Sequence, residues 1–306
     1  MKKIFIQNGN RDKDYDKDHE KDHKKDHDED HAEHEYGSKH SCRRWDTILK
    51  TLKELYRYRQ MIFSLVKRDL RGRYKGSVLG FLWTFLNPLL QLVVYSLVFS
   101  TIMRAGIEDY YLFLFVGLVP WMFFGSCLTG GTGCIWQQQD MVKKIYFPRE
   151  VLPIAYVLSQ FVNMLLIFIV IFAVLILSGH GLNAAALCYL PAVMLVELIL
   201  ALGMTMILCG MAVYFRDLEY IFSIISMAWM YLTPVMYDME MVPLEYRNYF
   251  SVNPMSPVIS AYREILYDKQ IPQMHTLLSG FLCGSIILLA GWFVFSVMKR
   301  NFAEEL

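Results

Sequence analysis

Six long apolar stretches dominate this chain of 306 residues. They lie at about 79–103, 112–131, 151–177, 186–214, 221–237 and 277–298. A bilayer core is about 30 Å thick, and a helix needs about 20 mostly apolar residues to cross it. Each stretch meets or approaches that length, and a proline such as Pro120 is tolerated inside a membrane helix. The sequence therefore predicts an all-α integral membrane protein with six transmembrane helices.

The basic residues that flank these stretches are unevenly distributed between the two sides of the predicted bundle. If the N-terminus lies inside, 17 Lys and Arg residues from residue 43 onward fall on inner segments and 4 fall on outer segments. Cytoplasmic segments of membrane proteins carry an excess of Lys and Arg. The sequence therefore predicts that both ends of the chain lie inside, which agrees with an even number of spans.

Residues 1–42 form an acidic, histidine-rich segment that differs from the rest of the chain. Residues 11–40 hold 12 acidic and 7 basic side chains and almost no apolar ones. Such a segment cannot bury enough apolar surface to offset the entropy that ordering removes. We therefore expect it to be disordered.

Histidines in this tail are weak candidates for metal binding. The stretch from His19 to His23 matches the H-E-x-x-H pattern of zinc proteases. That pattern needs a helix beside a substrate cleft, and repeats of Asp, His and Lys produce it by chance. Four histidines spaced by four residues would share one face of a helix; they are His19, His23, His27 and His31. Loose binding of zinc or nickel and a solvated charged tail both stay open.

Residues 43–78 are predicted to form a cytoplasmic amphipathic helix and a basic lead-in to the first span. Apolar residues recur there at helical spacing, at Trp45, Ile48, Leu49, Leu52, Leu55, Tyr56, Phe63 and Val66. A basic amphipathic helix lies in the membrane surface; the alternative is a cytosolic helix packed on a partner. Gly76 and Gly80 allow bends before the first span. Residues 79–306 then form the transmembrane domain.

Polar side chains recur at helical spacing in two of the apolar stretches. In the first stretch this face and the neighbouring tryptophan comprise Trp83, Thr84, Asn87, Gln91 and Tyr95. In the fifth they comprise Ser223, Ser226, Trp229, Met230, Thr233 and Tyr237. Polar side chains in a span face protein or water rather than lipid, and aromatic rings suit the apolar faces of sugars. Periodicity leaves open whether these residues line a polar channel or bond neighbouring helices together.

The segment 137–153 joins the second and third predicted spans on the inner side. It combines basic and aromatic residues with a proline: Lys143, Lys144, Tyr146, Phe147, Pro148, Arg149 and Glu150. Pro148 can occupy the first turn of the following helix. Anchoring to the membrane surface by basic and aromatic residues is one explanation of this composition.

Four segments carry a resemblance to a known family. They read RDLRGRYKGSVLGFLWTFLNPLL (68–90), DMVKKIYFPREVLP (140–153), FRDLEYIFSIISMAWMYLTP (215–234) and NPMSPVISAYREILY (253–267). Together they resemble the permeases of type-2 ABC exporters, in particular the branch that exports polysaccharides (O-antigen, capsule) and teichoic acids. The resemblance covers roughly residues 45–306 and does not include the acidic tail.

The resemblance implies an exporter built from separate subunits in the bacterial cytoplasmic (inner) membrane. Two copies of the permease enclose a channel for a lipid-linked polysaccharide, and this favours channel lining for the polar stripes. The segment 137–153 docks on an ATPase subunit, which binds ATP and magnesium, whereas no cofactor is expected on this chain. Short re-entrant helices are expected before the last span. Replacing Phe147 or Arg149 is expected to block export without loss of membrane insertion.

Other functions are less consistent with the sequence. The chain lacks the G-x-x-x-x-G-K-[ST] pattern of a P-loop, so it is not expected to be the ATPase. The resemblance implies a permease subunit and not an enzyme, and nothing predicts a nucleic-acid partner. An exporter of a drug or small lipid is an alternative. A membrane glycosyltransferase would need paired acids, and Asp217 and Glu219 are better explained as a helix cap. Glu197, the one carboxylate deep in a span, is a candidate for transport or for contact with a partner.

Overall fold

The structure of this chain, a computed structural model, describes residues 53–73, 76–102 and 106–305. The chain divides into two compact units, residues 1–57 and 58–306, and the account below concerns the second. The histidine-rich tail and residues 45–52 of the predicted amphipathic helix lie outside the described residues. Disorder, metal binding and membrane contact of these segments therefore stay predictions.

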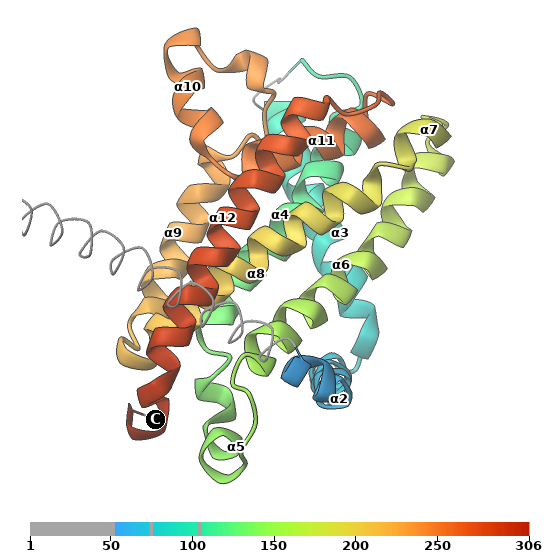
Figure 1. Cartoon of the computed structure of the whole chain (residues 1–306). Coiled ribbons are helices and arrows are strands. Elements are labelled where there is room, and N and C mark those ends of the chain that lie inside the picture. The colour runs from blue at the N-terminus through green and yellow to red at the C-terminus, as the bar shows by residue number, and fades with distance from the viewer. Residues whose placement is uncertain (1–52, 74–75, 103–105, 306) are drawn as a thin grey trace, which may run out of the picture. The chain divides into compact units, whose positions relative to one another are not determined.

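The described residues of the second unit form helices joined by turns and loops, as predicted (Figure 1). The α-helices are α2 (Arg59–Gly72), α3 (Trp83–Ser96), α4 (Tyr110–Thr132), α5 (Gln139–Lys144), α6 (Val151–Leu177), α7 (Ala184–Leu187), α8 (Leu190–Tyr214), α9 (Leu218–Leu232), α10 (Leu244–Val252), α11 (Met255–Leu266), α12 (Met274–Met298) and α13 (Phe302–Glu305). Short 3-10 turns are η1 (Gly80–Leu82), η3 (Trp136–Gln138), η4 (Met239–Met241) and η5 (Lys299–Asn301), and η2 (Leu97–Ile102) is a π-helical turn.

Five of the six predicted spans are confirmed as helices of sufficient length and apolarity. Within the described residues these are Gly80–Ser100, Tyr110–Thr132, Val151–Leu177, Ala184–Tyr214 and Met274–Asn301. Gly76 and Gly80 have φ angles of 87° and 47°, which L side chains rarely adopt. The chain therefore bends at both glycines on its way from α2 into α3.

The fifth predicted span is shorter than expected. The helix α9 has 15 residues and is about 22 Å long, whereas the bilayer core measures about 30 Å. The helix ends because Thr233 is extended, with φ −103° and ψ 137°, as a residue before proline prefers to be. The prediction of a continuous helix to residue 237 is therefore wrong.

Helix α4 forms the centre of the bundle. It packs against α3, α6, α8, α9 and α11, and side chains on all its faces are buried, including Phe115, Leu118 and Phe124. A helix that is apolar all round belongs in the interior. The other long helices surround this central element.

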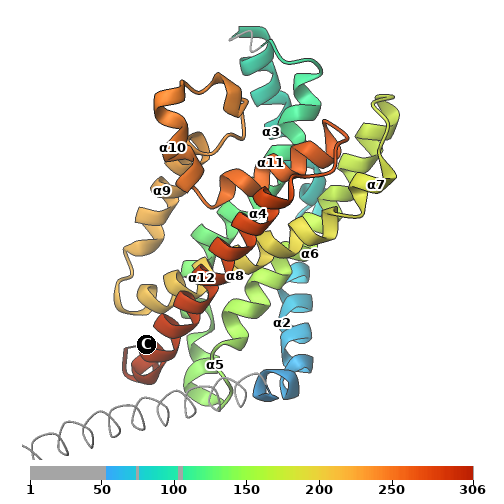
Figure 2. The ribbon, with the colours of Figure 1, turned by 45° about the horizontal axis from the view of Figure 1, so that its top comes forward.

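Helices α8 and α12 lie side by side along much of their length (Figures 1 and 2). Their backbones meet at Gly203 and Gly291. A Cβ atom added at Gly203 would lie 2.6 Å from the backbone nitrogen of Leu288. Small residues that let backbones approach are a main source of helix association in membranes, so this crossing fixes α12 on α8.

The bundle has two distinct ends (Figure 2). Helices α2 and α5 and the C-terminus gather at one end, here called the α5 end, and α7, α10 and α11 gather at the other, here called the α11 end. The segment between α9 and α12 thus contains two short helices, α10 and α11, as predicted. Their depth in a membrane, and which end faces the cytoplasm, stay predictions.

Candidate transport and coupling sites

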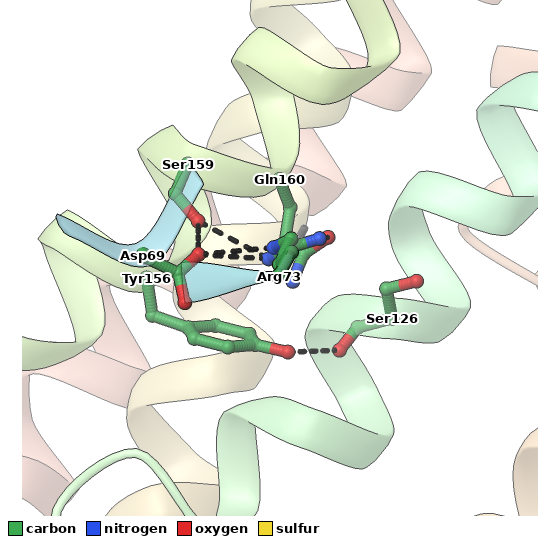
Figure 3. A network of polar contacts seen from close by, with 6 residues as sticks. All are labelled: Asp69, Arg73, Ser126, Tyr156, Ser159 and Gln160. Carbon is green, nitrogen blue, oxygen red and sulfur yellow. Dashed lines mark hydrogen bonds and ion pairs between the residues drawn. The ribbon is translucent and has the colours of Figure 1, made fainter. Parts of the chain in front are cut away.

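Arg73 joins α2 to α6 at the α5 end (Figure 3). Its guanidinium donates hydrogen bonds to Asp69 Oδ2 at 2.8 Å and to Gln160 Oε1 at 3.0 Å. It also donates to Ser159 Oγ at 3.3 Å, and that hydroxyl donates to the same Asp69 oxygen. Ser159 and Gln160 are buried. From sequence, Arg73 was only one member of a basic cluster; the structure makes it part of an interhelical network.

A cavity of about 560 Å³, here called the α3 cavity, adjoins this network. It lies between residues of α3, α4 and α6, and its polar lining consists of Arg73, Thr84, Asn87, Ser126, Gln160 and Asn163. Trp83 adds an aromatic surface to the same wall. Three residues predicted to line a channel, Trp83, Thr84 and Asn87, therefore come together around a hollow within one protomer.

The other two residues of the first polar stripe lie farther along α3. The amide of Gln91 donates a hydrogen bond to Asn87 Oδ1 at 3.3 Å, which continues the polar face by one turn. Tyr95 is half-buried one further turn along. The predicted stripe is thus one continuous face of α3, and its first half borders the cavity.

The polar stripe of α9 has a different environment. Ser226, Met230 and Thr233 are buried, and α9 packs on α4, with the Trp229 and Phe124 rings 5.5 Å apart in an edge-to-face contact. These side chains therefore make contacts within the protomer, the alternative that the spacing left open. Ser223, by contrast, is exposed.

Asn253 joins the end of α9 to the start of α11. Its amide donates to Thr233 Oγ1 at 2.8 Å, and its Oδ1 accepts from the Trp229 indole at 2.9 Å. The same oxygen accepts from the backbone N–H of Met255 at 3.0 Å. The sequence analysis missed this role, although Asn followed by Pro254 is typical of a turn before a helix.

Arg263 fixes the chain that follows α9. Its guanidinium donates to the backbone carbonyls of Val235 at 2.6 Å and Tyr237 at 3.2 Å, and it lies 3.6 Å from the centroid of the Phe113 ring. Burial lowers the pKa of this guanidinium to about 10, which leaves it charged at neutral pH. The sequence analysis counted Arg263 only among the basic residues of the outer segments. Tyr237, a predicted lining residue, accepts one of these hydrogen bonds through its backbone carbonyl.

Glu197 is fully buried in α8. One of its oxygens accepts a hydrogen bond of 2.6 Å from the Tyr262 hydroxyl of α11. Its Oε1 has no hydrogen-bond partner among the described residues. Glu197 thus joins α8 to α11 within the protomer, and a transport role for it stays a prediction.

The segment from α5 to α6 is divided into an exposed half and a buried half. In the exposed half, Lys143 and Lys144 end α5 and Tyr146 is 97% exposed. The sequence suggested that Pro148 occupies the first turn of the following helix. Pro148 lies before that turn, because α6 begins at Val151. Instead the Val151 N–H donates to the Pro148 carbonyl at 3.1 Å, which closes a turn.

The buried half is held by the C-terminal end of the chain. Phe147 is buried, and the buried carboxylate of Glu150 forms an ion pair with Lys299. Arg149 donates a hydrogen bond to the Lys299 carbonyl, and its guanidinium lies 5.7 Å from the centroid of the Phe302 ring. Phe147 and Glu150 therefore face the interior and Arg149 is partly exposed, whereas Lys143, Lys144 and Tyr146 are exposed. Docking of this segment on an ATPase stays a prediction.

The acidic residues predicted to cap a helix lie at the start of α9, whereas the histidines predicted to bind metal lie outside the described residues. Asp217 occupies the position before α9 without a side-chain capping hydrogen bond, and Glu219 lies in the first turn, so their effect on the helix is electrostatic. Among the described residues, no group of three or more His, Cys, Asp or Glu side chains lies close enough together to hold a metal ion.

Apolar helices long enough to cross a bilayer define a multi-pass membrane protein, and a polar cavity between α3, α4 and α6 is typical of the transport class. The family model for the ABC-2 type transporter matches residues 60–267. The chain belongs to this family and is a multi-pass protein of the bacterial inner membrane.

The curated relatives are permeases that export polysaccharides. The O-antigen export system permease protein RfbA of Myxococcus xanthus is 34% identical over 261 residues, which cover 85% of this chain and 100% of the relative. RfbA of Klebsiella pneumoniae is 31% identical over 80% of this chain and 95% of the relative. The polysialic acid transport protein KpsM of Escherichia coli is 24% identical over 69% of this chain and 82% of the relative.

Proposed function

We propose that this chain is the permease subunit of an ATP-driven exporter that moves a lipid-linked polysaccharide of the O-antigen or capsule type across the inner membrane. The main support for this proposal is the 34% sequence identity to an O-antigen export permease over that relative's whole length. The α3 cavity supports it, because hydroxyl and amide groups beside Trp83 suit sugar hydroxyls and ring faces.

A second copy of the chain completes the channel. Helices α3 and α9 both leave large side chains exposed, among them Val93, Val94, Ile224 and Tyr231. A single bundle with a half-open cavity cannot enclose a polymer, and closed two-fold pairs are the commonest assembly. In this arrangement Trp83, Asn87 and Ser223 lie on the lining surface, whereas Ser226, Met230 and Thr233 support it from behind.

The α5 end faces the cytoplasm and receives the ATPase subunit. Lys143, Lys144 and Tyr146 provide the exposed contact surface, and ATP and magnesium are bound by the partner. The buried half of the segment passes displacement to α6 directly and to the end of α12 through Glu150 and Lys299. With both ends of the chain inside, α9 and the buried residues 233–236 together form the sixth crossing.

Co-purification and export test this proposal. When the tagged chain is expressed together with a P-loop ATPase encoded by a neighbouring gene, purification of the chain should recover that ATPase. Tyr146→Ala should reduce the recovery about tenfold, which corresponds to a loss of roughly 1.4 kcal/mol of binding free energy. Tyr246→Ala, at an exposed tyrosine of α10, is the matched control and should have no effect.

Two outcomes would contradict the proposal. Recovery of the chain without any P-loop protein would remove the energy source that it requires. Normal surface polysaccharide in cells without this chain, together with loss of dye or small-lipid efflux, would favour an exporter of small molecules instead.

A further inference from the structure

Arg73 borders two cavities. Besides the α3 cavity, a second one of about 270 Å³, here called the α2 cavity, lies among residues of α2, η3 and α6. Asp69, the ion-pair partner of Arg73, lines only the α2 cavity. The ion pair therefore lies where the two hollow regions meet.

The charges at this junction favour an anion. Two basic residues, Arg68 and Arg73, and one acidic residue, Asp69, are among the residues that line the α2 cavity. Two N–H groups of Arg73 donate to the same Asp69 oxygen, at 2.8 and 3.3 Å. A guanidinium binds carboxylate and phosphate through the same donors. Asp69 thus occupies the position that the oxygen of a phosphate would take.

The surroundings of Arg73 match a ligand with three chemically different parts. On one side the α3 cavity supplies hydroxyl and amide groups and the Trp83 ring, which suit a sugar. Just before α3, the chain exposes Val78, Leu79 and Leu82, which suit an alkyl chain. The guanidinium of Arg73 is 26% exposed as a side chain. Arg73 lines the α3 cavity, and residues 78–82 follow it closely along the chain.

We propose that Arg73 binds the phosphate of a phosphorylated glycolipid, and that this phosphate replaces Asp69 on the guanidinium. The sugar then occupies the α3 cavity, and the alkyl chain lies against residues 78–82. The inference rests on the proposed function, because it places recognition of the exported lipid-linked substrate within the permease.

A purely structural role for the ion pair makes different predictions. If Asp69 only fastens Arg73 to α6, then Asp69→Asn lowers the stability of the folded protein and does not strengthen phosphate binding. If Asp69 competes with a ligand phosphate, then Asp69→Asn leaves Arg73 more available and strengthens phosphate binding. The sign of the change in affinity therefore separates the two roles.

Binding to the purified full chain in nanodiscs tests the inference. The probes are dodecyl phosphate, inorganic phosphate and the uncharged dodecyl maltoside. Thermophoresis measures the affinity of each probe for the protein. We expect Arg73→Gln to weaken dodecyl phosphate binding about tenfold or more, and Asp69→Asn to strengthen it several-fold. Arg73→Lys should be intermediate because it keeps the charge but loses the planar donor fork. Arg71→Gln, an exposed arginine on the same helix, is the matched control and should leave binding unchanged.

Several results would overturn the inference. Equal losses in Arg73→Gln and Arg71→Gln would indicate general surface charge, and weaker binding in Asp69→Asn would indicate a structural bridge. Inorganic phosphate that binds as tightly as dodecyl phosphate would assign the site to a free anion. The assay needs no ATPase, so failure to bind leaves the exporter proposal standing, and failure to recover an ATPase leaves the binding result interpretable.

Discussion

The centre of the bundle and its two outer helices α3 and α9, here called the edge helices, are all built from apolar sequence, yet they differ in packing. At the centre, α4 is buried on all faces and α8 meets α12 through glycines. At the edge, α3 and α9 bury few side chains, and α3 borders a large polar cavity. Lipid is as apolar as a protein interior, so helices associate where backbones can approach closely. Small residues therefore mark the closely packed crossing of α8 and α12, and polar residues mark the part of α3 that borders the cavity.

The largest expected effect comes from breaking the centre. Gly203→Leu should greatly reduce the yield of folded protein, because its Cβ would lie 2.6 Å from the backbone nitrogen of Leu288, and a cost above about 4 kcal/mol is a large share of the roughly 5–15 kcal/mol by which proteins are stable. Membrane yield and thermal unfolding in detergent measure this. Gly72→Ala, where an added Cβ has open space, should be tolerated; equal loss in both variants would show that the crossing is not special.

The second prediction separates the two halves of the segment between α5 and α6. Phe147→Ala should lower the free energy of unfolding by about 3–4 kcal/mol, because it leaves a cavity in a buried site. Tyr146→Ala should change it by less than about 0.5 kcal/mol, since that ring is exposed. Thermal unfolding of both purified variants checks this. Replacing Phe147 is thus expected to lower stability in addition to blocking export, whereas membrane insertion is expected to persist. Equal stability of the two variants would contradict the division.

The third prediction concerns the edge. Asn253→Ala should cost about 2 kcal/mol, because it leaves the Trp229 indole and the Met255 N–H without their partner. Thermal unfolding, with Gln270→Ala at an exposed position as control, measures the loss. Increased protease cleavage between α9 and α11 should accompany it, and unchanged cleavage would argue against the junction role.

The smallest effect is a pH dependence at the α11 end. Burial, and then the carboxylates of Asp238 and Glu264, raise the pKa of Asp268. The folded state therefore binds this proton more tightly than the unfolded state, and stability falls as pH rises from the unfolded-state pKa of about 3.9 through the raised native value. Asp268→Asn should flatten this part of a stability–pH profile, whereas Glu245→Gln, on exposed α10, should not. An unchanged slope in Asp268→Asn would refute the assignment.

Some features followed from the sequence because the physical constraint on them is local. A long apolar run must form a helix in lipid, since every backbone polar group needs an internal partner. Six spans were predicted on this basis, and five of them are confirmed as helices of sufficient length. Even the early end of α9 has a local cause, Pro234, whose effect on Thr233 the sequence analysis did not apply.

By itself, the sequence determined which segments are helical and which residues share a face. Only the tertiary structure decided where those faces point: the α3 stripe borders a cavity, whereas much of the α9 stripe packs on α4. It also joined Glu150 to Lys299, and Arg73 to Ser159 and Gln160, across long sequence separations. The physical reason is that lipid and protein interior are equally apolar. The spacing of apolar residues therefore does not show whether a helix face contacts lipid or another helix. Which helix meets which is set by the fit of side chains that are far apart along the chain.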